Sequence, residues 1–385
     1  MNAPIPYGRQ DVTADDIAAV EAVLRSDWLT QGPAVPAFEQ ALAAACGVDH
    51  AVAVNSATSA LHLAYLALGL GPGDLLWTSP NTFVATANAA RMCGAEVGFI
   101  DIDPRSYNLD ADALAEALER AERHGRLPKI VVPVHFAGQS CDMAAIGALA
   151  RRYGFRVVED ASHAVGARHD GATVGAGRHS DITVFSFHPV KIITTAEGGM
   201  ALTRDAALAE RMRLLRSHGI TRDPKRLTVV DAGAWYYEQH ELGFNYRMTD
   251  MQAALGLSQL ARLDDYVERR HAIAQRYDAA LRDQALQLPW RDPCDRSALH
   301  LYPVQVLAPR GRRAVFDAMR AAGIGVNVHY IPVHLQPDYR RLGHAAGDFP
   351  QAEAYYARAL SLPMFPTLDG AAQQRVIDTL IAALQ

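Results

Sequence analysis

Residues 186–200, SFHPVKIITTAEGGM, are the stretch on which our prediction of fold and chemistry depends. They place Lys191 between Val190 and the pair Ile192-Ile193, with no carboxylate nearby before Glu197. Apolar surroundings lower the pKa of a lysine and leave a nucleophilic amine, which forms a Schiff base with an aldehyde such as pyridoxal phosphate. The alternative is a lysine that ends a buried strand and extends to solvent, which is the commoner situation for a single lysine.

The scarcity of lysine strengthens the chemical interpretation. Of the 37 lysines and arginines in the chain, only Lys129, Lys191 and Lys225 are lysines. Positive charge is supplied elsewhere by arginine, and a guanidinium cannot form a Schiff base. A lysine in an apolar turn therefore indicates a functional amine.

Composition limits the class of protein. The chain has 385 residues, of which 50% are hydrophobic and 21% charged, which predicts a globular protein large enough for two domains. The net charge of −5 gives no reason to expect nucleic acid or an anionic membrane as a partner. The four cysteines are far apart, so neither a metal site nor disulfides are expected. No signal peptide or membrane-spanning run is recognised, and we expect a cytoplasmic protein.

Short apolar runs alternate with helical patterns through the first 205 residues. Because parallel strands need helical crossovers, this alternation predicts an α/β fold, a seven-stranded and mostly parallel sheet with helices on both faces. The last two strands flank the Lys191 turn with no helix between them and are candidates for antiparallel pairing. The predicted strands are residues 51–55, 75–80, 96–102, 130–136, 156–162, 182–187 and 199–204.

A change of pattern predicts a second domain. Thr13 is a candidate helix N-cap near the start of the chain, and Thr249 with Gln252 matches a capping box. The second motif opens a helical pattern over 252–283, which we interpret as one long connecting helix. The predicted division is a large domain, 1–255, and a smaller C-terminal α+β domain, 256–385. The smaller domain is expected to contain strands at 300–306 and 325–331 and helices at 313–323 and 371–385.

Polar residues at the C-terminal ends of strands are the candidates for a ligand site in such a sheet. Thr58 and Ser59 open a helix directly after a strand, where backbone N–H groups and hydroxyls suit a phosphate. Simple helix capping is the alternative. Phe83 follows another strand and is a candidate to lie against a flat cofactor ring, although core packing is commoner for a single phenylalanine.

The run Val157-Val-Glu-Asp160 ends a strand in two acidic residues. A carboxylate at a buried sheet edge needs a cation, and a protonated pyridine nitrogen would be one. Glu159 and Asp160 point to opposite faces of the strand, and spacing alone does not decide between them.

Two further groups complete the set. Ser186, five residues before Lys191, is a candidate phosphate ligand, and Asn245 and Arg247 precede the capping box and could bind a phosphate or carboxylate. A solvated loop is the alternative for the second group. An aldehyde-reactive lysine, a phosphate site, an aromatic ring and a carboxylate together are what pyridoxal phosphate requires, whereas a Schiff-base aldolase would need only the lysine.

These residues lie in blocks that resemble the DegT/DnrJ/EryC1/StrS family of sugar aminotransferases, and within it the PseC-type UDP-4-amino-4,6-dideoxy-N-acetyl-β-L-altrosamine transaminases. The resemblance covers nearly the whole chain. It rests on the blocks WLTQGP, NSATSALHLA, SPNTFVATANA, EDASHAVG, FSFHPVKIITTAEGGM, RSHGI, LGFNYRMTDMQAALGLSQL and HYIPVHLQP.

The resemblance implies a fold-type I aminotransferase and a role for each candidate. Lys191 would be the Schiff-base lysine, Asp160 the partner of the pyridine nitrogen, Phe83 the stacking ring, and His163 a neighbour of the ring or its phenolic oxygen. Thr58, Ser59 and Ser186 would hold the phosphate, with Asn245 supplied by the other subunit of a homodimer. The cofactor would alternate between pyridoxal and pyridoxamine phosphate.

The implied reaction moves an amino group from L-glutamate to C4 of a UDP-linked 4-keto-6-deoxy-N-acetylhexosamine in pseudaminic acid-type nonulosonate synthesis. Another UDP- or dTDP-linked sugar 3- or 4-aminotransferase is the alternative, and a non-catalytic pyridoxal-phosphate-binding regulator is a second one. Family members that are dehydratases have histidine in place of the lysine, so Lys191 argues against that branch. Cations are needed for the nucleotide diphosphate, and the candidates are Arg216, His218, Arg222, Arg247 and His329.

Overall fold

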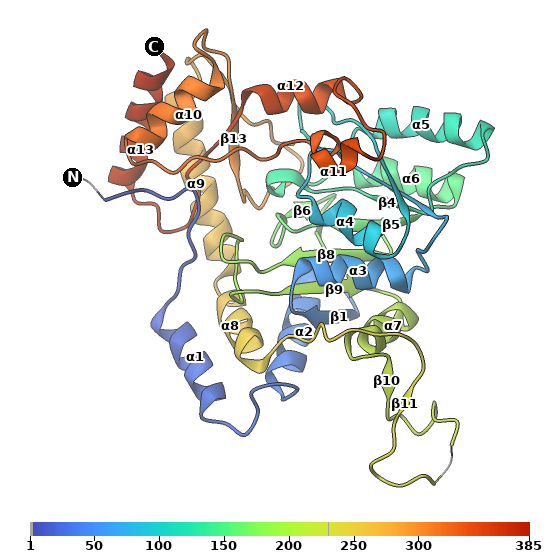
Figure 1. The fold of residues 1–385 in the computed structure, drawn as a ribbon. Coiled ribbons are helices and arrows are strands. Elements are labelled where there is room, and N and C mark those ends of the chain that lie inside the picture. Colours follow the sequence, from blue (N-terminus) through green and yellow to red (C-terminus); the bar gives the residue numbers. More distant parts are fainter. Residues whose placement is uncertain (1–2, 230) are drawn as a thin grey trace.

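The computed structural model describes residues 3–229 and 231–385, and a seven-stranded sheet lies at its centre (Figure 1). The strand order is β1-β9-β8-β5-β4-β2-β3, and β9 alone runs antiparallel to its two neighbours. The predicted α/β sheet is confirmed, including the antiparallel pair around the Lys191 turn. The strands are β1 (His50–Val54), β2 (Leu75–Thr78), β3 (Glu96–Phe99), β4 (Ile130–Val132), β5 (Arg156–Asp160), β8 (Ile182–Ser186) and β9 (Gly199–Thr203).

Alternating residues of each strand pack on opposite faces of the sheet, and helices cover both. Val52 and Val54 of β1 join one hydrophobic cluster, whereas Ala51 and Ala53 join another. This two-sided burial explains why most positions of the strands are apolar. The first face is covered by α3 (Ala57–Ala67), α4 (Ala85–Met92) and α7 (Ala206–Arg216), and the second by α2 (Ala34–Cys46), α5 (Ala111–Arg123), α6 (Met143–Tyr153) and α8 (Asp250–Leu260).

Both predicted helix starts are confirmed. α1 (Ala14–Leu24) begins after Thr13, which forms a capping box with Asp16, and α8 begins after Thr249, which forms one with Gln252. The two helices pack against each other, with α1 on the outside of the molecule (Figure 1).

The prediction of one long helix over 252–283 is wrong. α8 ends at Leu260, and α9 (Leu263–Leu281) begins after two intervening residues. Arg262 leaves helical geometry between them, with a φ of −108° and a ψ of 9°, and its guanidinium donates to both carboxylate oxygens of buried Asp16 at 2.6 and 2.8 Å. The contact with α1 therefore accompanies a break that local propensity did not indicate.

A second core lies in the C-terminal part of the chain. It packs the second half of α9 against an antiparallel sheet of β12 (Leu286–Gln287), β13 (Tyr302–Val306) and β14 (Ala359–Leu362), with α10 (Gly311–Ala321) and α13 (Gly370–Leu384). The first half of α9 packs in the core beneath the large sheet, so this helix contributes to both. The division at residue 255 remains a prediction.

The predicted strand at 325–331 is also wrong. Only Asn327 forms an isolated bridge there, with Ser361, and β14 takes the position in the small sheet. The side chains of Asn327 and His329 bond within this segment instead, and it lines the cavity described below.

The remaining elements connect these layers. No helix in the described part of the chain is long and apolar enough to span a membrane. The connecting elements are the hairpins β6 (Arg168–His169) with β7 (Ala172–Thr173) and β10 (Ile220–Thr221) with β11 (Glu238–Gln239), the 3-10 turns η1 (Phe136–Gly138) and η2 (Val333–Leu335), and the helices α11 (Pro337–Arg340) and α12 (Pro350–Arg358).

Candidate active site

A cavity of about 580 Å³ lies at the C-terminal ends of the parallel strands, as expected for a ligand site in an open α/β sheet. Its walls combine the start of α3, the ends of β5 and β8, the Lys191 turn and the irregular segment 327–330. Seven of the residues singled out in the sequence line it: Thr58, Phe83, Asp160, His163, Ser186, Lys191 and His329.

Lys191 lies in a closed loop between β8 and β9. The loop is fixed at its base because Phe187 N–H donates to Gly198 O at 2.9 Å and Thr195 N–H to Phe187 O at 3.0 Å. Burial lowers the pKa of the Lys191 amine to about 8, and the negative charge of Asp160 offsets only part of this effect. The amine is therefore a better nucleophile at neutral pH than an ordinary lysine.

Asp160 lines the cavity from the end of β5, and Glu159 points to the other face. The two oxygens of Asp160 accept hydrogen bonds from Thr86 Oγ1 at 2.7 Å and from Ser162 N–H at 3.1 Å. Glu159 bonds His135 Nε2 at 2.7 Å and accepts from Thr183 Oγ1 at 2.9 Å, away from the cavity. Of these two carboxylates, only that of Asp160 therefore faces the cavity.

The start of α3 lies at the cavity wall, which agrees with the prediction for Thr58 but not with that for Ser59. The cap is Ser56, whose Oγ accepts Ser59 N–H at 3.1 Å, and the cavity is lined by Ser56, Ala57 and Thr58. Ser59 does not line the cavity, and its hydroxyl donates to Asn55 Oδ1 at 2.7 Å. A Cβ on Gly199 of β9 would lie 2.5 Å from Ala57 N, so only glycine allows the strand to pass this closely beneath the turn.

An aromatic residue is available for a flat ring. Phe83 is 59% exposed although it lines the cavity, and its ring centroid is 6.3 Å from that of Tyr330. A phenylalanine serving only to fill the core would be buried.

His163 and His329 are both neutral. Burial and the nearby Lys191 lower the pKa of His329 to about 3, and burial, Lys191 and His329 hold the pKa of His163 well below its usual value. His329, predicted as a cation for the diphosphate, therefore cannot supply a positive charge. Its ring nitrogens are already bonded to Ser361 and Asn327.

The other predicted phosphate and substrate residues lie outside this cavity. Backbone pairing of 216–218 with 244–246 brings Arg216, His218, Asn245 and Arg247 together in a separate region. Arg216 and Arg247 line a second pocket of about 240 Å³ there, where Arg216 is paired with Glu39 at 2.7 Å. His218 and Asn245 are exposed, and exposed Arg222 lies over the Tyr237 ring.

Several residues of the cavity wall were not predicted from the sequence. Thr86 and Tyr330 lie within blocks that carried the family resemblance, but no local pattern indicated a contact with Asp160 or His163. Tyr7, His300 and Asn327 come from distant parts of the chain and carried no signal. These wall residues are Tyr7, Thr86, His300, Asn327 and Tyr330.

The side chains present fit pyridoxal phosphate. An amine with a lowered pKa can bond an aldehyde, a carboxylate held by two donors can face a ring N–H, an exposed aromatic can cover the ring, and a helix start can take the phosphate. All four occur in one cavity. No group of three or more metal-ligating side chains that could hold an ion was found among the described residues.

Comparison with known proteins agrees with this fit. The model of the family described as DegT/DnrJ/EryC1/StrS aminotransferase matches residues 10–381. The chain is 43% identical to the spore coat polysaccharide biosynthesis protein SpsC of Bacillus subtilis over 370 residues, 94% of this chain and 93% of that one. It is 39% identical to a UDP-4-amino-4,6-dideoxy-N-acetyl-β-L-altrosamine transaminase of Campylobacter jejuni over 389 residues, 99% of this chain and 98% of that one.

Solved structures share the fold over the whole chain. PseC of Helicobacter pylori, an aminotransferase of pseudaminic acid biosynthesis, superposes with a TM-score of 0.90 at 32% identity, covering 99% of both chains. The pyridoxal-phosphate form of the sugar aminotransferase Spr1654 of Streptococcus pneumoniae superposes with a TM-score of 0.89 at 28% identity, covering 99% of this chain and 98% of that one.

Proposed function

Because this chain belongs to the DegT/DnrJ/EryC1/StrS aminotransferase family, we propose that it transfers an amino group from L-glutamate to C4 of a UDP-linked 4-keto-6-deoxy-N-acetylhexosamine. It is a sugar aminotransferase of fold type I with pyridoxal phosphate as its cofactor. The finer assignment, to pseudaminic acid-type synthesis, is supported by the names of relatives that match over nearly the full chain.

The observation that carries the proposal is the meeting of Lys191 and Asp160 in one cavity beside Phe83. Pyridoxal phosphate, when bound, supplies a carbonyl that takes up and returns an amino group and a ring that spreads negative charge. Lys191 would hold it covalently and then, as a free amine, take the proton from the α-carbon of the donor and deliver it to the former carbonyl carbon of the cofactor. With the sugar, the same amine would move a proton in the opposite direction, to C4 of the acceptor.

The remaining residues would hold and orient the reacting groups. Asp160, fixed by Thr86 and Ser162, would accept a hydrogen bond from the ring nitrogen and keep it protonated. Phe83 would cover one ring face. Thr58, Ser186 and the start of α3 would bind the phosphate, with Ser59 fixing the turn through Asn55.

We assign Asn245 to the site of the other subunit in a homodimer. Its side chain is exposed and lies outside the cavity of its own chain. Arg247, His218 and Arg222 also lie outside that cavity, and in the dimer they would supply cations for the diphosphate. Exposed apolar residues on α1 and on the segments just before and after it support an interface between copies, since a solvated face of this kind is normally covered. They are Val12, Ile17, Leu24, Trp28 and Leu29. A reducing, cytoplasmic setting suits the four free cysteines.

Incubation with a panel of nucleotide-linked ketosugars plus L-glutamate tests the proposal, with the product identified by mass and sugar NMR. We expect a 4-amino sugar from the UDP-linked 4-keto-6-deoxy-N-acetylhexosamine. Amination only of a dTDP-linked sugar, or at C3, would support the alternative of another nucleotide-sugar aminotransferase and contradict the assignment.

A further inference from the structure

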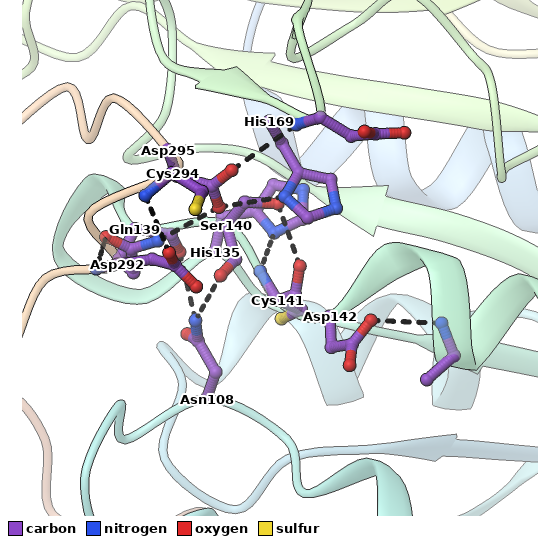
Figure 2. A network of polar contacts seen from close by, with 12 residues as sticks. Asn108, His135, Gln139, Ser140, Cys141, Asp142, His169, Asp292, Cys294 and Asp295 are labelled. Carbon is purple, nitrogen blue, oxygen red and sulfur yellow. Dashed lines mark hydrogen bonds and ion pairs between the residues drawn. The ribbon is translucent and has the colours of Figure 1, made fainter.

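The loop after β4 is held rigidly by buried polar contacts (Figure 2). Asn108 Oδ1 accepts Phe136 N–H at 2.9 Å, and Asn108 Nδ2 donates to Gln139 O at 3.0 Å and Ser140 O at 2.9 Å. At the end of the loop, His135 Nδ1 accepts Cys141 N–H at 3.1 Å. Asn108 thus ties one loop end to the other and fixes the direction of the N–H groups between them.

One of those N–H groups determines the protonation of His163. Ala137 N–H donates to His163 Nδ1 at 3.2 Å, so this nitrogen must carry a lone pair and no hydrogen. The ring is also neutral, because burial and the nearby Lys191 and His329 hold its pKa well below the usual value. A neutral imidazole without hydrogen on Nδ1 carries it on Nε2.

The hydrogen on Nε2 then determines how the Tyr330 hydroxyl is oriented. Nε2 lies 3.0 Å from Tyr330 Oη, so Nε2 donates and Oη accepts. Burial, together with the negative charge of Asp160, raises the pKa of Tyr330, so the phenol keeps its own hydrogen. In the described part of the chain Oη has no second hydrogen-bond partner, and Tyr330 lines the cavity.

We propose that Tyr330 donates its hydroxyl hydrogen to an oxygen of the ligand bound beside Lys191, with His163 acting as the positioning residue that aims it. The oxygen that accepts this hydrogen bond is either the phenolic oxygen of the cofactor or an oxygen of the sugar substrate. This inference rests on the proposed function for the identity of the sugar. Tyr330 is thus a ligand-binding residue on the one segment whose predicted strand structure was wrong.

The test is Tyr330→Phe, which removes only the hydroxyl. Loss of one such hydrogen bond is expected to change the affected quantity about tenfold. If the acceptor belongs to the cofactor, the dissociation constant for pyridoxal phosphate rises and the absorption band of the loaded protein shifts. If the accepting oxygen belongs to the sugar, the dissociation constant for pyridoxal phosphate and the absorption band stay unchanged. KM for the nucleotide sugar then rises, while the half-reaction with glutamate keeps its rate.

A matched control is Tyr355→Phe. Tyr355 is buried and its hydroxyl donates to His329 O at 2.9 Å, but it does not line the cavity. This control is expected to lower thermal stability without changing cofactor affinity, the absorption band or KM. The inference is overturned if Tyr330→Phe, like the control, leaves cofactor affinity, spectrum, KM and both half-reactions within twofold of the wild type.

The outcomes separate this inference from the proposed function. If the wild-type protein aminates no nucleotide ketosugar of the panel, the proposed function fails. Tyr330 is then judged on the cofactor measurements alone, and unchanged affinity and spectrum refute the hydrogen bond.

Discussion

At the scale of single residues, the surroundings of Lys191 and Asp160 determine what each can do. The amine of Lys191 has a pKa of about 8, against 10.5 for an ordinary lysine, because burial disfavours its charged form. At pH 7 a lysine with this pKa is uncharged in about a tenth of the molecules, several hundred times the fraction of an exposed lysine.

This difference predicts a pH dependence for uptake of the cofactor. Only the uncharged amine attacks an aldehyde, so the rate of capture by the apoprotein should rise with pH and level off above about 8. Stopped-flow absorbance after mixing with pyridoxal phosphate measures it. Nα-acetyl-lysine, which keeps a free side-chain amine, is the control for titration of the aldehyde itself. Its rate of reaction with pyridoxal phosphate should continue to rise beyond pH 9. A protein profile parallel to that control would mean that Lys191 is not desolvated.

Asp160 and Glu159 offer a matched pair on one strand. Asp160→Asn should lower the turnover rate by about a hundredfold or more, because the ring nitrogen loses the charge that keeps it protonated. Glu159→Gln should keep the rate, since Glu159 bonds His135 and Thr183 on the other face of the sheet, and should lower stability instead. Steady-state kinetics and thermal unfolding of both variants separate the two effects. The reverse pattern would show that the wrong carboxylate has been assigned.

At the scale of elements, the contact between α1 and the α8–α9 break is a buried ionic network. Burial alone would raise the pKa of Asp16, but hydrogen bonds from Arg262, Ser258, the Thr13 backbone and Gln259 lower it. Removing the carboxylate would leave Arg262 without its partner and release α1 from α8.

Asp16→Ala is therefore expected to cost about 3 kcal/mol in the free energy of unfolding, measured by urea denaturation. Asp15→Ala is the control on the same helix turn: Asp15 is exposed, and its loss should cost about 0.5 kcal/mol through the helix dipole. Equal costs for the two variants would show that the network contributes nothing beyond a surface charge.

The elements also show which parts of the fold can be predicted from the sequence. The strands of the large sheet were predictable because apolar runs bounded by turns reflect burial on both faces, a local property. The helix break at Arg262 was not, because its partner Asp16 lies 246 residues away. The segment 325–331 has the pattern of a strand, but the side chains of Asn327, His329 and Tyr330 line the cavity and bond to one another or to distant residues.

The candidate site was likewise predictable in part. Asp160 ends a strand, Lys191 and Thr58 follow strands, and topology places strand ends together, so their meeting was predictable. The contacts of Thr86 with Asp160 and of Tyr330 with His163 were not predictable, because only the folded chain creates them.

At the scale of the whole molecule, the proposed dimer makes each cavity depend on two chains. Lys191→Ala and Asn245→Ala should each be inactive as pure proteins. When the two are unfolded together and refolded as a mixture, half the dimers should be hybrids with one complete site. About a quarter of the wild-type activity should then return. No recovery in the mixture would place Asn245 in the site of its own chain, and full activity of pure Asn245→Ala would place it in neither site.

The central claim is that the amine of residue 191 binds the cofactor, and the scarcity of lysine makes this claim directly testable. The loaded protein is reduced with borohydride, digested, and analysed by mass spectrometry for the pyridoxyl group. We predict the group on the peptide containing Lys191 and on neither of the peptides containing Lys129 and Lys225. A protein that retains no pyridoxyl group after reduction, or that carries it on Lys129 or Lys225, would contradict the account.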